Sequence, residues 1–301
     1  MFEKILVPLD GSRLAEVALP YAEAFAKDFN SDVTLLHVVD IGEAYDGALG
    51  RARELHQQVK AMGTEYLHGI KERLDERGIR ARPDIHEGRA AEGIIDYSER
   101  HEIGLIIMST HGQSGNGVVG YGSVADKVLR GSQVPLLLIR APEGREPFIR
   151  RILVPLDGSP LAEEALRYAA EVAERFNAEL ITLRIIPVAE EAFLSPESYI
   201  FLRGLEEEIE ASAKEYLEIV TQPLNQKGVR CRNVTLRGYP ATQITDYASL
   251  QQVDLTIIST HGRSGVGRWA YGSVADKVLR SSGTPVLVIR PREVSEGSAN
   301  L

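Results

Sequence analysis

The chain alternates short apolar runs with longer stretches in which apolar residues recur every three or four positions. The short runs have the length and composition of buried strands, and the longer stretches predict amphipathic helices. In the first half of the chain, the predicted strands cover residues 4–9, 32–39, 80–87, 104–108 and 135–140. The predicted helices cover residues 12–29, 55–76, 90–100 and 123–130. Strands that alternate with helices predict an α/β fold built on a parallel, doubly wound sheet.

The same pattern occurs a second time along the chain. The segment Leu-Val-Pro-Leu-Asp-Gly-Ser at 6–12 returns at 153–159, and the ten residues 121–130 return letter for letter at 271–280. A repeat of this length predicts two domains in tandem. The expected organisation is a first domain at 1–141, a linker at 142–147, a second domain at 148–293 and a flexible tail at 294–301.

Two strand ends carry residues that a buried sheet does not require. Asp10 follows the first predicted strand, and the segment 109–112 ends the fourth with Ser-Thr-His-Gly. In open α/β sheets, ligands bind beyond the carboxyl ends of the strands where the strand order reverses. If both ends line one site, strands one and four are neighbours. The predicted order in each five-stranded sheet is therefore 3-2-1-4-5.

The fifth strand of each half then lies at a sheet edge. It reads Leu136–Ile139 in the first half and Val286–Ile289 in the second, and both runs are entirely apolar. An exposed edge strand usually carries charge or proline. We therefore expect the two edges to bury each other about a pseudo-twofold axis, so that the chain is a pseudo-dimer of its own halves.

A glycine-rich loop connects the fourth strand of each half to the next helix. Ser123 is expected to be the N-cap of that helix in the first half, with Asp126 completing a capping box. Glycines let the backbone approach a ligand closely, and a helix N-terminus presents free N–H groups to an anion. The loop therefore indicates a phosphate-binding site in each half.

Composition and charge narrow the class of protein. The 301 residues, of which 44% are hydrophobic, suffice for two cores, and the net charge of −9 argues against a nucleic-acid-binding surface. No apolar run reaches membrane-spanning length, and the N-terminus lacks the pattern of a signal peptide. Cys231 is the single cysteine, so no internal disulfide forms. We expect a cytoplasmic protein without a nucleic-acid or membrane partner.

These motifs resemble the nucleotide-binding branch of the universal stress protein family, in its tandem two-domain form. The family signature places nine residues between a glycine and a Gly-Ser or Gly-Thr pair. Residues 112–123 fit this spacing, and residues 262–273 fit it again. The chain departs from the signature at Ser109 and Ser259, where the family has its first glycine.

The resemblance implies one adenine-nucleotide site per domain, for ATP, ADP or AMP, with Mg²⁺ accompanying a triphosphate. It assigns Asp10 and Asp157 to the ribose or adenine and places Val39 and Ile186 against adenine. Arg263 is included because arginine makes charge-assisted contacts with phosphate. The implied binding residues are Pro8, Leu9, Asp10, Val39, Met108, Ser109, Gly112, Gly115, Gly122, Ser123 and Val124 in the first domain, and Pro155, Leu156, Asp157, Ile186, Ile258, Ser259, Gly262, Arg263, Gly265, Gly272, Ser273 and Val274 in the second.

The resemblance also implies a regulatory or binding role in stress response, with ATP hydrolysis slow or absent. The chain has no GxxxxGKS or GxxxxGKT loop, and neither His111 nor His261 has a recognisable nucleophile as partner. One alternative is an enzyme that adenylates or cleaves ATP, although the turn at 10–12 is shorter than the pyrophosphate loop of such enzymes. The other is an interaction module that has lost nucleotide, which Ser109 and Ser259 favour. The protein partner stays open, as does the formation of a homodimer by two chains.

Overall fold

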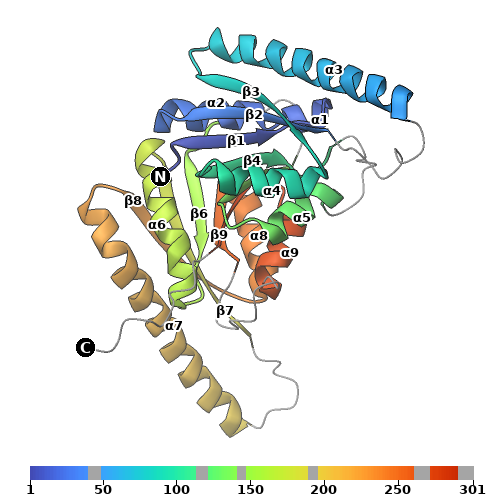
Figure 1. The fold of residues 1–301 in the computed structure, drawn as a ribbon. Coiled ribbons are helices and arrows are strands. Elements are labelled where there is room, and N and C mark those ends of the chain that lie inside the picture. Colours follow the sequence, from blue (N-terminus) through green and yellow to red (C-terminus); the bar gives the residue numbers. More distant parts are fainter. Residues whose placement is uncertain (40–48, 113–120, 141–146, 189–195, 261–271, 291–301) are drawn as a thin grey trace, which may run out of the picture.

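The computed structural model describes residues 1–39, 49–112, 121–140, 147–188, 196–260 and 272–290 (Figure 1). The elements of the first half are β1 (Lys4–Pro8), α1 (Arg13–Glu16), α2 (Leu19–Phe29), β2 (Asp32–Val39), α3 (Leu49–Asp75), β3 (Ala81–Glu87), α4 (Ala90–Arg100), β4 (Leu105–Ser109), α5 (Ser123–Gly131) and β5 (Leu136–Ile139). Those of the second half are β6 (Arg151–Pro155), α6 (Pro160–Arg175), β7 (Glu179–Ile186), α7 (Pro196–Gln226), β8 (Arg230–Arg237), α8 (Pro240–Leu250), β9 (Leu255–Ser259), α9 (Ser273–Ser281) and β10 (Val286–Ile289).

The strands of both halves belong to one sheet with the order β3-β2-β1-β4-β5-β10-β9-β6-β7-β8. Within each half the paired strands are parallel, and their order is 3-2-1-4-5, which confirms the prediction. Strands β5 and β10 pair in the antiparallel direction, with Leu137 opposite Leu287. The two predicted five-stranded sheets are thus the halves of one continuous sheet.

Helices cover both faces of this sheet (Figure 1). Buried residues of α2, α3, α6 and α7 form one core with strand residues such as Ile5 and Val7. Helices α4, α5, α8 and α9 form the other core with Leu6 and Leu36. Because side chains alternate between the faces of a strand, one short apolar strand supplies both cores.

The join between the halves repeats one polar contact on each side. Arg140 Nη2 donates to the carbonyl of Arg280 at 2.7 Å, and Arg290 Nη2 donates to the carbonyl of Arg130 at 2.9 Å. The four residues are two equivalent pairs of the repeat, as a pseudo-twofold axis requires. Every residue of β5 and β10 is buried, so the apolar edges meet as the sequence predicts.

An aromatic cluster forms a second contact between the halves. Phe2, Phe25 and Phe29 of the first half pack against Tyr168 and Phe176 of the second, with Phe25 and Phe176 ring centroids 5.2 Å apart. Phe2 and Phe25 are fully buried. Such aromatic contacts add to the burial of apolar area that they bring. Side-chain packing therefore holds α2 against α6.

The helix predicted over residues 12–29 is in fact two helices, α1 and α2, separated at Val17 and Ala18. Pro20 explains the break, because it has no N–H to donate to the carbonyl of Glu16. The equivalent residue in the second half is Arg167, and there α6 runs without a break. The sequence prediction of one continuous helix was wrong for the first half alone.

Strand β3 forms in spite of Pro83, which lies opposite Leu35 in the register with β2. The strand lies at the outer edge of the sheet. A proline is tolerated on an edge strand where the missing N–H faces away from the neighbouring strand. The position of β3 at the edge thus accounts for a residue that a central strand would reject.

The longest helices, α3 and α7, lie against the outer strands at the two ends of the sheet (Figure 1). Helix α3 begins six residues earlier than the sequence predicts, at Leu49 instead of Leu55. Charged residues recur along both helices. No helix in the described ranges combines the length and apolarity needed to cross a membrane.

Candidate functional site

A cavity of about 310 Å³ lies where the strand order reverses in the first half. The C-terminal ends of β1 and β4 and the N-terminus of α5 surround it. The predicted site residues that line it are Pro8, Leu9, Asp10, Met108, Ser109, Gly112, Gly122, Ser123 and Val124. The fold thus brings three separate segments of the chain around one space. Gly115 lies outside the described residues.

Val39, which the resemblance placed against adenine, does not line the cavity, whereas Val38 and Leu36 do. Adjacent residues of a strand point to opposite faces of the sheet. Val38 packs in the core on the α4 side, and the same holds in the second half for Ile185 but not for Ile186. In the first half, the residue that lines the cavity is therefore the one before the predicted Val39, and its equivalent in the second half is Ile185.

Asp10 is held on a tight turn directly after β1. Gly11 has a φ of 85°, a conformation that favours glycine, and the N–H of Ser12 donates to Asp10 Oδ1 at 2.9 Å. A Cβ atom at Gly112 would overlap Asp10 Oδ2. The sequence assigned this glycine to phosphate, but in the structure its missing side chain makes room for the carboxylate of Asp10.

The N-cap of α5 is Gly122, and Ser123 is the first helical residue, so the predicted cap was wrong by one position. The predicted capping box does not form, because the Asp126 carboxylate is bound by Arg130 at 2.9 Å. Glycine offers no side-chain acceptor to the first turn. The first N–H groups of α5, including that of Val124, therefore lie uncapped by a side chain at the cavity wall.

The turn after β4 is organised by its own hydroxyl groups. Ser109 Oγ accepts from the N–H of His111 at 3.2 Å, and Thr110 Oγ1 lies 2.9 Å from His111 Nδ1. The carbonyl of Thr110 accepts from the N–H of Gly122 at 2.8 Å, which ties the start of α5 to the end of β4. Ser109 thus stabilises the turn at the position where the family signature has glycine.

One wall of the cavity is apolar. Leu36 and Val38 of β2, Met108 of β4, and Ala90 and Ile94 of α4 contribute to it. The sequence analysis missed both α4 residues. The apolar spacing of α4 predicts a buried face, but the spacing alone does not indicate which part of that face borders an open space.

The second half repeats the strand ends of this site. Asp157 Oδ1 accepts from the N–H of Ser159 at 3.0 Å and from its hydroxyl at 2.6 Å. Gly272 is the N-cap of α9, and Ser273 is its first residue. Pro155 and Leu156 end β6 and begin the turn, Ile258 and Ser259 end β9, and Val274 lies in the first turn of α9. Three further predicted site residues fall outside the described ranges: Gly262, Arg263 and Gly265.

The two sites differ beside the aspartate turn. In the first half, His37 Nδ1 lies 2.7 Å from the carbonyl of Leu9. In the second, Arg184 takes the place of His37 and donates to the carbonyl of Leu156 at 3.3 Å. A Cβ at Gly158 would lie 2.8 Å from Arg184 Nη1. The second site therefore has a permanent positive charge packed against its turn.

A half-buried tyrosine lies near each aspartate. Tyr66 donates to Glu16 at 3.2 Å, and Tyr216 donates to Glu163 at 3.0 Å. Burial, followed by these carboxylates, raises the pKa of both phenols above the usual value of about 10. Both tyrosines therefore stay neutral donors at physiological pH.

Comparisons with known proteins agree with this architecture. The sequence model of the universal stress protein family matches residues 1–140 and 149–290. A universal stress protein of Mycolicibacterium smegmatis is 25% identical over 310 aligned positions, which cover 96% of this chain and 97% of that protein. Universal stress protein MJ0531 of Methanocaldococcus jannaschii is 30% identical over 144 residues, 48% of this chain and 85% of its own.

Among solved structures, a universal stress protein from Archaeoglobus fulgidus covers 96% of this chain and 97% of its own length, at 21% identity and a TM-score of 0.68. That likeness shows a shared fold over both halves. The family match extends over nearly the whole chain and occurs once in each half. The chain therefore belongs to the universal stress protein family, in the form that carries two copies of the family domain.

Proposed function

We propose that the protein binds an adenine nucleotide beyond the ends of β1 and β4 in the first half, and beyond β6 and β9 in the second. Its role would be regulatory, in stress response, in the cytoplasm. The observation that carries this proposal is the meeting of three features at one cavity. These are the carboxylate of Asp10, an apolar wall and a helix N-terminus without a side-chain cap.

Each feature suits one part of a nucleotide. The Asp10 carboxylate can accept hydrogen bonds from ribose hydroxyls, and the side chains of Val38 and Met108 can pack against adenine. The N–H groups at Ser123 and Val124, together with the positive end of the α5 dipole, suit a phosphate. A volume of about 310 Å³ lies at the lower end of the range for small-molecule sites, so it suits adenine and ribose.

Mg²⁺ would accompany a bound triphosphate. In the described ranges, no three His, Cys, Asp or Glu side chains converge as a metal site. Mg²⁺ commonly keeps several waters and binds phosphate oxygens with few protein ligands. The ion would therefore be held mainly by the nucleotide, where it neutralises the charge of the phosphates.

The surroundings of His111 favour binding over catalysis. Its Nδ1 lies within hydrogen-bond distance of Thr110 Oγ1, and its backbone N–H bonds Ser109 Oγ. Both contacts stabilise the turn that shapes the cavity. We therefore assign His111 to the structure of the site.

The test has two measurements on the freshly purified chain. Mass spectrometry identifies small molecules released on denaturation, and calorimetry then follows titration with ATP, ADP and AMP. ATP or ADP released, with two binding events per chain, is the expected result. AMP accompanied by ATP turnover would favour the enzyme. The absence of both released nucleotide and binding heat would contradict the proposal and favour an interaction module.

A further inference from the structure

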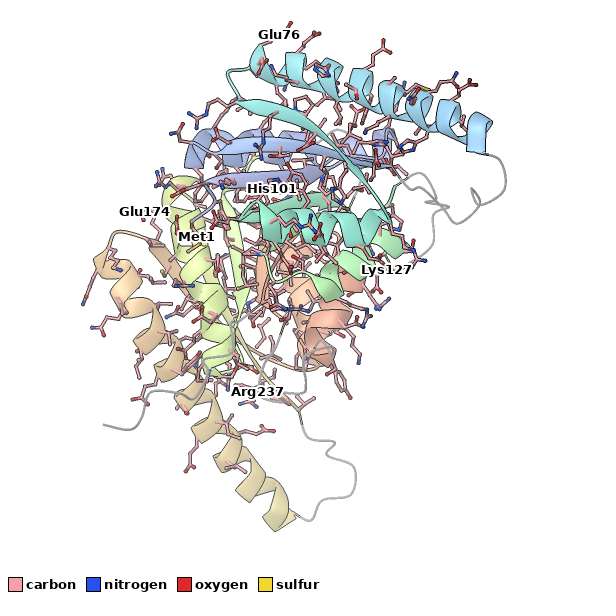
Figure 2. The ribbon with its side chains drawn as sticks, in the orientation of Figure 1. Met1, Glu76, His101, Lys127, Glu174 and Arg237 are labelled. Carbon is pink, nitrogen blue, oxygen red and sulfur yellow. The ribbon has the colours of Figure 1, made fainter. Side chains whose placement is uncertain are left out.

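A groove of about 1210 Å³ lies at the N-terminal ends of β6, β7 and β8, whereas the nucleotide cavity lies at the C-terminal ends of strands. Helix α2 of the first half forms one side of it. The residues before β6, the end of α6 and the start of β8 form the other side. Figure 2 labels Glu174 at this end of α6, directly before Arg175. The groove shares no lining residue with the cavity at the strand ends.

The lining of this groove is rich in unneutralised positive charge. Lys27, Arg150, Arg151, Arg175 and Arg230 all line it, and none of them forms a salt bridge with another residue of the described chain. The protein as a whole carries a net charge of −9. Five such cations along one groove of an acidic protein concentrate positive potential there.

The acidic residues of the groove do not balance these cations. Glu23 is bound by Arg77 at 2.9 Å, and Glu179 is bound by Arg232 at 3.2 Å. Asp28 is the remaining acid of the lining, and burial raises its pKa against the opposing effect of two neighbouring cations. Among the described residues of the lining, one carboxylate without an arginine partner therefore accompanies five cations.

The repeat shows that the fold does not need these arginines. At the positions of Arg150 and Arg175, the first half has Glu3 and Asp28. Both halves build the same sheet with the same strand order. The two positions accept opposite charges, so the positive charge of the second half requires a reason other than folding.

Two cations occur at equivalent positions in both halves, but their hydrogen-bond and ion-pair partners differ. Arg80 of the first half is neutralised by Asp32 at 2.6 Å, whereas its equivalent, Arg230, has a backbone carbonyl at 2.6 Å and no carboxylate partner among the residues that the structure describes. Lys4 has a carboxylate at 3.7 Å, whereas the side chain of its equivalent, Arg151, donates to the backbone carbonyl of Gln251. At these two strand positions, therefore, the cation of the first half has a carboxylate partner and the cation of the second half has a backbone carbonyl.

The geometry suits several linked anionic groups. Arg151 and Arg230 flank Glu179 in register on adjacent strands, which lie about 4.8 Å apart. The guanidinium of Arg150 is stacked 3.8 Å from the ring centroid of Phe148, which limits its motion. Arginine binds phosphate through two parallel hydrogen bonds. We propose that this groove binds a small polyphosphate anion, at a site separate from the nucleotide cavity.

The experiment uses the full chain and inorganic tripolyphosphate as the probe, with binding followed by calorimetry. The variant Arg150→Glu/Arg175→Asp gives the second half acidic residues of the kind found at these positions in the first. We expect binding at least tenfold weaker in this variant, and an affinity in the parent that falls steeply with salt. Hydrogen exchange should show protection at residues 147–151 and 175–179 in the parent and none in the variant.

The matched control is Lys4→Ala/Arg80→Ala, which removes the two equivalent cations at the N-terminal ends of β1 and β3 in the first half. It should change tripolyphosphate binding less than twofold. ATP binding at the strand ends should be unchanged in Arg150→Glu/Arg175→Asp, whose fold is checked by its melting temperature. Arg150→Gln alone should weaken tripolyphosphate binding about threefold, and it tests the site should the double variant unfold.

Three results would overturn the proposal: no binding by the parent, equal binding by the charge-reversed variant, or protection confined to residues at the nucleotide cavity. A further arm identifies the source of the phosphates. If ATP protects residues 147–151 as tripolyphosphate does, the ligand is a nucleoside polyphosphate. If tripolyphosphate alone protects them, the ligand is an inorganic polyphosphate.

Discussion

The two halves have the same strand order but different surroundings. At the strand ends they agree closely: Asp10 and Asp157 each accept an N–H from the serine two residues later, at 2.9 and 3.0 Å. Away from the strand ends they diverge. The first helix is broken at Pro20 in one half and continuous through Arg167 in the other. The comparison separates what the site requires from what the fold tolerates.

The ion pairs at the ends of β3 and β8 also differ between the two halves. At the end of β3, Glu87 is bound by Lys60 at 2.6 Å. At the end of β8, the equivalent residue is Arg237, labelled in Figure 2, which is bound by Glu206 at 2.6 Å and Glu210 at 2.9 Å. The acidic and basic residues of the Lys60–Glu87 pair are thus exchanged in the Glu210–Arg237 pair, and an ion pair forms in both halves. This position needs complementary charges, whereas the strand ends keep the same residue types because a ligand site needs particular groups.

The largest expected difference between the halves concerns their aromatic contact. Phe25 is fully buried in the cluster between α2 and α6, and its equivalent in the second half is Val172, also fully buried. Phe25→Ala should lower the free energy of unfolding by about 3–5 kcal/mol, because it leaves a cavity. Val172→Ala should cost roughly 2 kcal/mol, since it removes fewer buried groups. Denaturant midpoints with unchanged slopes give both values.

Leu250→Ala is the control for this comparison, because Leu250 is 79% exposed and its truncation leaves no cavity. It should change stability by less than about 0.5 kcal/mol. Equal costs for the Phe25 and Val172 variants would mean that the aromatic contact adds nothing to ordinary burial. The halves would then be held together mainly by the β5–β10 pairing and the polar contacts beside it.

Much of this architecture could be predicted from the sequence because it depends on strong local patterns. The apolar run Leu136–Ile139 predicted both a strand and its burial against β10. The break at Pro20 was missed, since the helical spacing of apolar residues continues through it. The role of Gly112 beside Asp10 depends on a contact between two distant segments, and no spacing within either segment indicates it.

The next prediction makes the second half resemble the first. Arg167→Pro places proline inside the continuous helix α6, where it removes a backbone hydrogen bond and should cost about 3 kcal/mol. Arg167→Ala is the matched control, and it should cost less than about 0.5 kcal/mol because this side chain is exposed. The measurement is the denaturant midpoint. A cost below about 1 kcal/mol for the proline variant would show that α6 tolerates a break at this position.

A third prediction tests whether the two sites bind alike. Asp10→Ala should weaken nucleotide binding in the first half by about 1.5–3 kcal/mol, roughly ten- to hundredfold. Asp157→Ala should do the same in the second half. Calorimetric titration of each single variant with ATP separates the two affinities, because each variant weakens the site of one half only. Unchanged affinity in both variants would remove the aspartates from the binding site.

A double-mutant cycle sharpens this result. Gly112→Ala should displace the Asp10 carboxylate and weaken binding by a similar amount, and the double variant should be little worse than either single variant. Gly69→Ala is the control, since a Cβ at Gly69 meets no atom within 4 Å. It should leave ATP binding unchanged. Fully additive losses would mean that Gly112 contacts the nucleotide independently of Asp10.

The smallest expected effect lies in the exchanged ion pairs. Lys60 and then His56 hold the pKa of Glu87 below its usual value. A carboxyl whose pKa is lower in the folded than in the unfolded chain stabilises the fold above the unfolded value of about 4.3. That contribution is lost as the pH falls through the lower, folded value. Glu87→Gln should therefore reduce the melting temperature at pH 6 by roughly a degree or less, and the difference should vanish by about pH 3.

Charge exchange tests the cause of this effect. Glu87→Arg alone places a cation beside Lys60 and should lower the melting temperature at pH 6 by more than Glu87→Gln does. Adding Lys60→Glu recreates the pair that the second half forms between Arg237 and Glu210, and it should recover most of the loss. Salt should weaken the effect in both variants, because the groups are exposed. If Lys60→Glu recovers nothing, the position depends on the particular residues and not on complementary charge, and the equivalence of the two clusters fails.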